Sequence, residues 1–277
     1  MDSYNQQLSQ RYADEHLATR LREALLAEGL NPDQLTLDDI AAIDQLHVGG
    51  RRSSRQLADL AEFLPGQQVL DLGCGTGGSS RLLVAEYGVQ VVGVDITQPF
   101  VDVARWLTEA TGLTARCHYT CADAQQLPLE TASFDAVWCQ HTLMNLPDLD
   151  QGLREIHRVL KPDGRLLLHE VLQGGNLEPL VFPVPWADDA STSHLHTPTE
   201  LEQQLRLAGF TPMFQQNVTE DALNWRKKHT EKEARGQIGI LTPQLIFGPR
   251  FLQMGKHLMA NLQQDKVWLM ESVWKKY

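Results

Sequence analysis

The sequence lacks the long apolar runs and the leader that are typical of membrane and exported proteins. Nowhere in its 277 residues is there a stretch of about 18 consecutive apolar side chains, which a membrane-spanning helix needs. Its first residues, Met1 to Gln7, contain neither a basic stretch nor an apolar segment of the signal-peptide kind. We therefore expect a cytoplasmic protein with no membrane-inserted part.

Cysteine is also scarce, and the chain has only Cys74, Cys117, Cys121 and Cys139. Each lies in or beside an apolar, strand-like run, and their number is too small for a disulfide-dense scaffold, so we expect reduced core thiols. Cys117 and Cys121 could begin a zinc site, but no second pair or neighbouring histidine cluster completes the ligand set. The sequence predicts no bound metal.

Positive charge is the third shortage. The chain has 24 Lys and Arg against 35 Asp and Glu, a net charge of −11. This balance repels phosphate backbones and anionic lipids, so neither nucleic acid nor a lipid surface is the expected partner. A small-molecule substrate fits the composition better.

The first elements that the sequence predicts are helices. Apolar residues recur at helical spacing before residue 31, and Gly29 ends that pattern. A second helix is predicted over residues 35–46, with Thr36 as its N-cap, and a third over residues 53–63. We interpret residues 1–50 as an N-terminal helical lid.

From Gln67 the period changes, and short apolar runs alternate with helical patterns. The predicted strands cover residues 69–72, 89–95, 115–121, 134–139 and 165–171. The helices predicted between them cover residues 78–87, 98–111 and 149–160. Alternation of apolar strands with helices indicates a parallel sheet covered on both faces, which is a doubly wound α/β fold.

The remaining third of the chain is less regular. Residues 173–197 are rich in Gly and Pro and read as a long loop, and a helix then opens at Thr197 and ends at Gly209. A strand is predicted over residues 210–218, a helical insertion over residues 219–263, and a final strand from Val267. We predict a main domain over residues 51–277, capped by the 173–197 loop and the 219–263 insertion.

A glycine-rich turn follows the first strand, in the run Val69-Leu70-Asp71-Leu72-Gly73-Cys74-Gly75-Thr76-Gly77-Gly78. Gly73, Gly75 and Gly77 let a ligand approach the backbone closely. Asp95 closes the second strand, where a carboxylate can accept hydrogen bonds from both ribose hydroxyls. These features indicate a nucleoside ligand but are shared with dinucleotide-binding enzymes.

Three further features distinguish this sequence from that of a dinucleotide-binding enzyme. Asp71 stands two residues before the first glycine, where it can orient the loop or a ligand ammonium group. Asp123 follows the third strand, where it can accept a hydrogen bond from an adenine amino group. The run Leu160-Lys161-Pro162-Asp163-Gly164-Arg165 makes a tight turn into the fifth strand.

With these motifs in order, residues 43–171 resemble a class I S-adenosylmethionine-dependent methyltransferase of the small-molecule branch, similar to quinone, sterol and amine methyltransferases. The resemblance implies a seven-stranded sheet whose last strand is antiparallel. The segment between the predicted strands 6 and 7 is longer than the family's usual hairpin, so we infer a helical insertion there. The cofactor-binding residues that it implies are Asp71, Gly73, Gly75, Gly77, Asp95, Ile96, Asp123, Ala124 and Gln140.

The implied reaction is in-line displacement, in which S-adenosylmethionine gives its methyl group to an oxygen, nitrogen or carbon nucleophile of a small metabolite. Histidine is the side chain best suited to take a proton from such a nucleophile near neutral pH. His141, after the fourth strand, and His47, in the lid, are the catalytic candidates. Met144, Trp186 and His194 are the candidates for contact with the acceptor, whereas His169 is expected in the core.

Three alternatives remain. A nicotinamide-dependent oxidoreductase shares the loop and Asp95, but no Tyr-x-x-x-Lys proton relay follows the fourth strand. A nucleic-acid methyltransferase is disfavoured by charge and by the sequence Gln140-His141-Thr142-Leu143, where Asn/Asp-Pro-Pro-Tyr/Phe is typical. A non-catalytic S-adenosylmethionine-binding protein is the third.

A homodimer is a further expectation. Leu258, Met259 and Leu262 are expected to form either a wall of the acceptor pocket or the dimer face.

Overall fold

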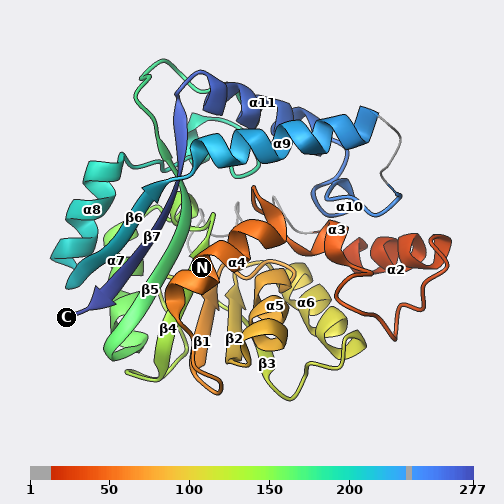
Figure 1. Ribbon diagram of the computed structural model, residues 1–277, viewed down its shortest axis with the longest axis horizontal. Coiled ribbons are helices and arrows are strands. Elements are labelled where there is room, and N and C mark those ends of the chain that lie inside the picture. Colours follow the sequence, from red (N-terminus) through yellow and green to blue (C-terminus); the bar gives the residue numbers. More distant parts are fainter. Residues whose placement is uncertain (1–13, 235–238) are drawn as a thin grey trace.

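The protein is built around one seven-stranded sheet (Figure 1). The computed structural model describes residues 14–234 and 239–277, so part of the predicted lid, residues 1–13, lies outside the described residues. The strands are β1 (Gln68–Leu72), β2 (Gln90–Asp95), β3 (Cys117–Cys121), β4 (Phe134–Gln140), β5 (Leu160–Gln173), β6 (Phe210–Asn217) and β7 (Val267–Lys276). Their order in the sheet is β3-β2-β1-β4-β5-β7-β6, and β7 runs antiparallel to both of its neighbours. The predicted seven-stranded sheet with an antiparallel last strand is confirmed.

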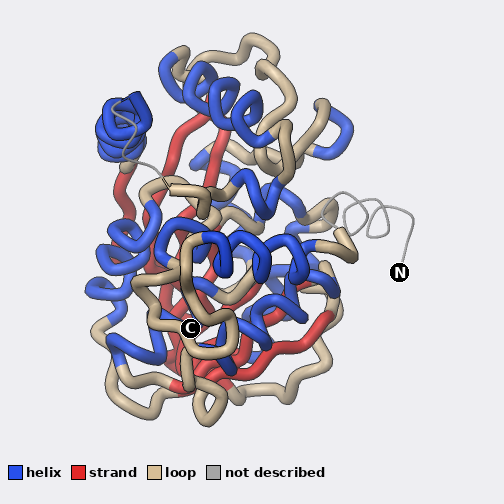
Figure 2. The backbone as a smooth tube through the Cα atoms, turned by 90° about the vertical axis from the view of Figure 1, so that its right-hand side faces the viewer, coloured by secondary structure: helices blue, strands red, loops and turns tan. Residues whose placement is uncertain are grey.

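Helices cover both faces of this sheet (Figure 2). They are α2 (Leu17–Ala27), α3 (Ala41–Asp44), α4 (Gly50–Ala61), α5 (Gly78–Tyr87), α6 (Gln98–Ala110), α7 (Leu149–Val159), α8 (Pro198–Leu207), α9 (Thr219–Ala234), α10 (Gln244–Phe247) and α11 (Phe251–Gln263). Short 3-10 turns occur at Leu143–Asn145 and Ala190–Thr192. The helical insertion predicted between the last two strands is present as α9, α10 and α11.

The strands divide their side chains between two cores. Leu70 and Val137 pack with the apolar faces of α7 and α8, whereas Val69 and Trp138 pack with α4, α5 and α6. This alternation follows from the two-residue period of a strand, and it places every second residue of β4 on the same face as Trp138. Gln140, at the end of β4, therefore points toward α4 and α5.

The N-terminal helices and the insertion meet beyond the carboxyl ends of the parallel strands. Leu21 of α2 and Ile246 of α10 share one buried cluster with Leu107 of α6. A second cluster joins Val218 and Leu258 to the loop before α8. In Figure 1, α9 and α11 accordingly lie across the top of the sheet and α10 lies beside α3. Within the described residues, none of the helices combines the length and apolarity needed to cross a bilayer.

The structure corrects the predicted helix over residues 35–46. Only α3, Ala41–Asp44, is helical there, and its N-cap is Ile40 rather than Thr36. Thr36 instead forms a closed turn with Asp39: the Thr36 amide donates to Asp39 Oδ2 at 2.7 Å, and the Asp39 amide donates to Thr36 Oγ1 at 3.3 Å. Side chains of this kind compete with helix formation by bonding the backbone locally.

Candidate active site

A cavity of about 170 Å³ opens at the carboxyl ends of β1, β2 and β4. This is the edge of an α/β sheet where ligands are expected to bind. Most of the predicted site residues line it together: His47, Asp71, Gly73, Gly75, Asp95, Ile96, Asp123, Ala124, Gln140, His141, Met144 and Trp186. Gly77 and His194 are not among the lining residues.

The glycines of the loop after β1 leave room for the protein itself. A Cβ on Gly73 would lie 2.1 Å from Thr142 Oγ1, and one on Gly77 would lie 2.4 Å from Tyr119 Oη. At both positions φ is positive, at +74° and +80°. Neighbouring side chains therefore occupy the space where a Cβ would lie at Gly73 and Gly77, while Gly73 and Gly75 both line the cavity. That these glycines let a ligand approach the backbone stays a prediction.

Asp95 is held by backbone donors. Its Oδ2 accepts from the Gly75 amide at 2.9 Å, and its Oδ1 accepts from the Thr97 amide at 2.8 Å. Each oxygen keeps acceptor capacity beyond these bonds, because a carboxylate has about four acceptor sites. Asp95 thus joins the glycine loop to the start of α6 while facing the cavity.

Asp71 is buried at the end of β1 and accepts a hydrogen bond from Ser80 of α5. Burial raises its pKa to about 7, in spite of the Ser80 hydrogen bond, and the charge of Asp95 adds to the increase. Asp44 and Asp123 complete four carboxylates on the cavity wall, and the described lining residues include no lysine or arginine. The described wall is suited to a cationic ligand.

Three histidine rings gather at and behind the wall of the cavity, where His47 and His141 line it. The ring centroids of His47 and His141 are 5.9 Å apart, and those of His141 and His169 are 5.1 Å apart with an interplanar angle of 7°. His169 is 2% exposed, as expected of a core residue, but it belongs to this cluster. Strand pairing accounts for its place, because His169 lies directly beside Gln140 in the β4–β5 register.

Burial keeps all three imidazoles uncharged. It lowers the pKa of His47 to about 4 and that of His169 to about 3. The pKa of His141 is well below its usual value, mainly through burial, with the neighbouring His169 and His47 adding to the shift. A neutral imidazole has a nitrogen that can accept a proton, but the lowered pKa makes it a weak base. Proton removal by these histidines therefore requires an acceptor group that has become strongly acidic, as one does when it gains a methyl group and a positive charge.

Gln140 links the histidines to the helices beneath them. Its Oε1 accepts from Ser79 Oγ at 2.7 Å and from Trp138 Nε1 at 2.9 Å, and its Nε2 lies 3.2 Å from His47 Nε2. Ser54 Oγ lies 3.1 Å from the same His47 nitrogen. Ser54 and Ser79 were missed from the sequence, although a serine on the buried face of a helix is a signal of such a network.

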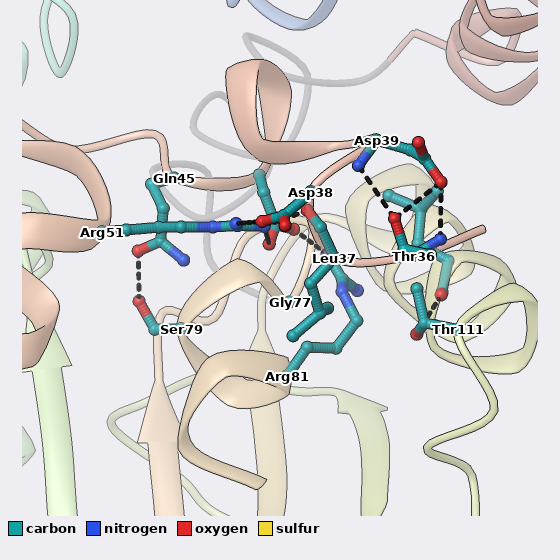
Figure 3. A network of polar contacts seen from close by, with 12 residues as sticks. Thr36, Leu37, Asp38, Asp39, Gln45, Arg51, Gly77, Ser79, Arg81 and Thr111 are labelled. Carbon is teal, nitrogen blue, oxygen red and sulfur yellow. Dashed lines mark hydrogen bonds and ion pairs between the residues drawn. The ribbon is translucent and has the colours of Figure 1, made fainter. Parts of the chain in front are cut away.

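A buried ion pair fixes the segment that carries His47. Arg81 of α5 is fully buried and bonds to Asp44 of α3, which also lies 3.6 Å from Arg51. Figure 3 shows Arg51 and Arg81 converging on this segment from α4 and α5. The fit is close, because a Cβ on Gly78 would lie 1.6 Å from the Asp44 carbonyl oxygen. No pattern in the sequence marks Arg81 as a core residue.

Not all of the residues predicted to contact the acceptor line the cavity. Trp186 is 2% exposed, donates from Nε1 to Ser193 Oγ at 2.9 Å, and lines the cavity together with Met144. His194 lies behind that wall, where its amide donates to the Met144 carbonyl at 3.0 Å. Leu258 and Leu262 are buried in the cluster beneath α9 and do not line this cavity, whereas Met259 is only partly buried. A role of this group in an acceptor wall or a dimer face stays a prediction.

Residues 70–168 match a family model described as a methyltransferase domain. "Methyltransferase GfsG" of Streptomyces halstedii is 35% identical over 146 residues, which are 53% of this chain and 52% of that protein. Further relatives are named as sterol C-, malonyl-[acyl-carrier protein] O- and phosphoethanolamine N-methyltransferases. The chain spans about half the length of GfsG and about a third of that of the sterol enzyme.

Solved structures share the fold over nearly the whole chain. The [4+2]-cyclase SpnF superposes with a TM-score of 0.69 at 24% identity, covering 98% of this chain and 96% of SpnF. Phosphoethanolamine N-methyltransferase 2 of Haemonchus contortus, solved with phosphomonomethylethanolamine and S-adenosylhomocysteine, gives a TM-score of 0.73 at 19% identity, covering 100% of this chain and 61% of that one. At such identities the likeness concerns the fold.

Proposed function

We propose that this chain, whose residues 70–168 match a methyltransferase-domain model, transfers a methyl group from S-adenosylmethionine to an oxygen, nitrogen or carbon nucleophile of a small metabolite. One observation carries the proposal. One cavity is lined both by carboxylates, at the strand ends that hold the glycine loop, and by the uncharged side chains of His47 and His141. The carboxylates suit a cationic nucleoside, and the histidines suit an acceptor that loses a proton.

The residues present fit the cofactor. S-adenosylmethionine has a net positive charge, and the described wall of the cavity carries Asp71, Asp95 and Asp123, whereas the charge of Asp44 is balanced by Arg81. Asp95 has acceptor capacity for a ribose diol, and Asp71 lies where the methionine ammonium group is expected. Ile96 and Ala124 supply apolar surface beside Asp123 for an adenine ring. The acidic wall disfavours the pyrophosphate of a nicotinamide dinucleotide, the first alternative reaction.

When bound, the cofactor supplies a methyl group already activated by a sulfonium, so the residues of this chain have mainly to align the acceptor and exclude water. Met144 and Trp186 are the apolar surface against which the acceptor lies. His141, with His47 as the second candidate, accepts the proton from the acceptor as the new bond to carbon forms. Gln140 fixes His47 through the contact between their side-chain nitrogens.

The segments above the sheet act as a lid and cap in this proposal. Leu46 and His47 belong to the N-terminal lid, residues 1–50, and both line the cavity. Pro185 and Trp186 of the 173–197 loop and Phe247 of the 219–263 insertion line it from the other side. Closure by these segments would keep water away from the transferred methyl group.

The experiment has two steps. Calorimetric titration with S-adenosylhomocysteine and with NAD distinguishes the cofactor classes, and binding of NAD alone would overturn the proposal. Incubation with isotopically labelled S-adenosylmethionine and fractionated small metabolites then tests transfer, with Asp95→Ala as the matched inactive control. We expect label in a small molecule with the parent chain alone.

A non-methylating S-adenosylmethionine-binding protein is the second candidate. It is favoured by the fold shared with SpnF, a protein described as a [4+2]-cyclase, because the fold by itself does not establish methyl transfer. Binding of S-adenosylhomocysteine without transfer of label to any fraction would support this candidate over the first.

Location and assembly complete the proposal. The net charge of −11 and the composition support a cytoplasmic protein that binds neither nucleic acid nor membranes. A homodimer is proposed through the open edge of β6, where Met213 is 56% exposed and Leu207 of the preceding helix is 73% exposed. Light scattering of the purified chain, compared with Met213→Lys, tests this assembly.

A further inference from the structure

A row of polar side chains crosses the apolar sheet beside the cavity. In the strand register, Gln140 of β4 pairs with His169 of β5, His169 pairs with Glu271 of β7, and Glu271 pairs with Gln216 of β6. Directly paired residues point to the same face, so all four side chains lie on the side of α4 and α5. His169 and Glu271 are 2% and 4% exposed. A buried acid and base in adjacent strands call for a reason beyond packing.

A second, small cavity lies against this row. Its volume of about 20 Å³ is enough to hold one water molecule, which needs about 10–15 Å³ by this measure. His169 and Glu271 line it from the sheet, Arg52 from α4 and Asp221 from α9. Arg52 and Asp221 are 3.9 Å apart and more than half exposed, so the far end of this cavity reaches the molecular surface.

The histidine rings form the wall between the two cavities. His47 and His141 line the main cavity, whereas His169 lines the small one. The centroid of the His169 ring is 5.7 Å from that of His47 and 5.1 Å from that of His141. On its other side, His169 Nε2 is 4.0 Å from Glu271 Oε1, a gap that one bridging water closes.

The proposed reaction makes such a connection useful. An electron pair of the acceptor forms the bond to the methyl carbon, the bond from that carbon to sulfur breaks, and its electron pair stays on sulfur. The positive charge of the sulfonium thereby passes to the acceptor, which regains neutrality by giving up a proton. In a cavity closed by a lid, that proton must leave before the next turnover.

We propose that His169 and Glu271 form a proton-release path, which carries the proton from His47 or His141 to the surface opening between Arg52 and Asp221. The inference rests on the proposed methyl transfer and deepens it. Both residues act through the histidines of the main cavity, so they are positioning and relay residues rather than groups that touch the substrate.

The charges around Glu271 suit this role. The groups that face it are His169 from β5, Asp221 from α9 and Arg52 from α4. Burial raises the pKa of Glu271 to about 7, and the charge of Asp221 adds to the increase. A carboxyl group with a pKa near neutrality both accepts and returns a proton at working pH.

The kinetic test separates the first turnover from later ones, with an acceptor identified by the labelled-cofactor screen. In Glu271→Gln, we expect the first turnover at close to the parental rate, because His141 still takes the proton, and steady-state turnover lowered about 10-fold or more. Formate should restore the steady state in Glu271→Ala. Asp221→Asn, at the exposed end, provides a variant whose folding is not at risk, and we expect a smaller reduction. Glu202→Gln, on the exposed face of α8, is the matched control.

A spectroscopic test needs no acceptor. In the complex with S-adenosylhomocysteine, the histidine ring NMR signals of His169 should step near pH 7 as Glu271 ionises. The step should vanish in Glu271→Gln and persist in Glu202→Gln. A missing step, a step that survives Glu271→Gln, or equal slowing of the first and later turnovers would overturn the path while leaving methyl transfer intact. A chain that methylates nothing overturns both proposals.

Discussion

The cofactor side and the acceptor side of the cavity are built by contacts of different range. On the cofactor side, Asp95 bonds to the amides of Gly75 and Thr97, which are 20 and 2 residues away in sequence. On the acceptor side, Gln140 meets His47 across 93 residues. The cofactor side is thus the end of a local strand, turn and helix unit, whereas the acceptor side exists only when distant segments pack together.

This difference separates the functions of the two sides. The parallel strands position the carboxylates through backbone pairing that depends little on the segments above them. The histidines depend on α3, α4, β5 and β7 being docked correctly. We therefore expect cofactor binding and turnover to respond to different substitutions. The joint between the two sides is the buried ion pair of Asp44 with Arg81, and we expect the stability of the protein to be most sensitive there.

The largest expected effect comes from breaking that joint. Asp44→Asn leaves the fully buried Arg81 guanidinium without its carboxylate, and loss of one partner of a buried pair typically costs about 3–5 kcal/mol. Urea denaturation measures the change in the free energy of unfolding. Asp38→Asn is the control, because Asp38 pairs with Arg51 at 97% exposure and should change stability little. Equal stability of the two variants would contradict the picture of a joint.

The next effect should be confined to the cofactor side. Asp95→Ala removes the acceptor for a ribose diol and the anchor of Gly75, and losing two hydrogen bonds to a charged group costs about 3 kcal/mol, or roughly 150-fold in affinity. Calorimetry with S-adenosylhomocysteine measures it. Asp102→Ala, an exposed acid of α6, should bind as the parent does. Unchanged affinity in Asp95→Ala would remove this residue from the site.

A smaller effect is expected on the acceptor side. His141→Ala removes the proposed proton acceptor, so turnover should fall by about 100-fold while S-adenosylhomocysteine binds as before. Labelled methyl transfer and calorimetry on the same preparation measure the two quantities. His118→Ala, exposed on β3, is the matched control. A parallel loss of binding and turnover would show that the two sides are not separable.

The cofactor side was also the part that the sequence could predict. Each of these strand ends is marked in the sequence by an apolar run that closes on an acidic residue, as at Asp71 and Asp95. Such an end can be predicted because the sequence pattern and the structure that it forms lie within the same few residues. Local signals failed where a side chain bonded its own turn, as Thr36 does with Asp39. At Gly73 they did not show that the missing side chain also makes room for Thr142.

The acceptor side could be predicted only as a set of candidates. His141 was identified after the fourth strand and His47 in the N-terminal lid, but nothing local shows that their rings lie beside each other. His169 and Glu271 become neighbours because β5 and β7 pair in antiparallel, although a helical insertion lies between these strands in the sequence. The burial of His169 could be predicted from the apolar strand around it. The side chains that His169 contacts depend on the strand register, which is set by the whole sheet.

The smallest effect concerns pH and sharpens the comparison from the cofactor side. Since burial raises the pKa of Asp71 to about 7, a substantial share of this carboxyl is protonated in the free protein near neutrality. A bound cation favours the ionised form, so binding below pH 7 must release a proton. The affinity for S-adenosylmethionine should therefore rise with pH, by up to about 10-fold for each pH unit below the pKa, and level off above it.

Calorimetry in buffers of different ionisation enthalpy counts the protons released. We expect proton release near pH 6 in the parent chain and almost none in Asp71→Asn, whose affinity should vary little with pH. Glu271→Gln should keep the parental dependence, because Glu271 has a similar pKa but does not line the main cavity. Affinity that falls as the pH rises, or proton release that persists in Asp71→Asn, would contradict the assignment. Loss of proton release in Glu271→Gln would instead mean that the two sides are electrostatically coupled.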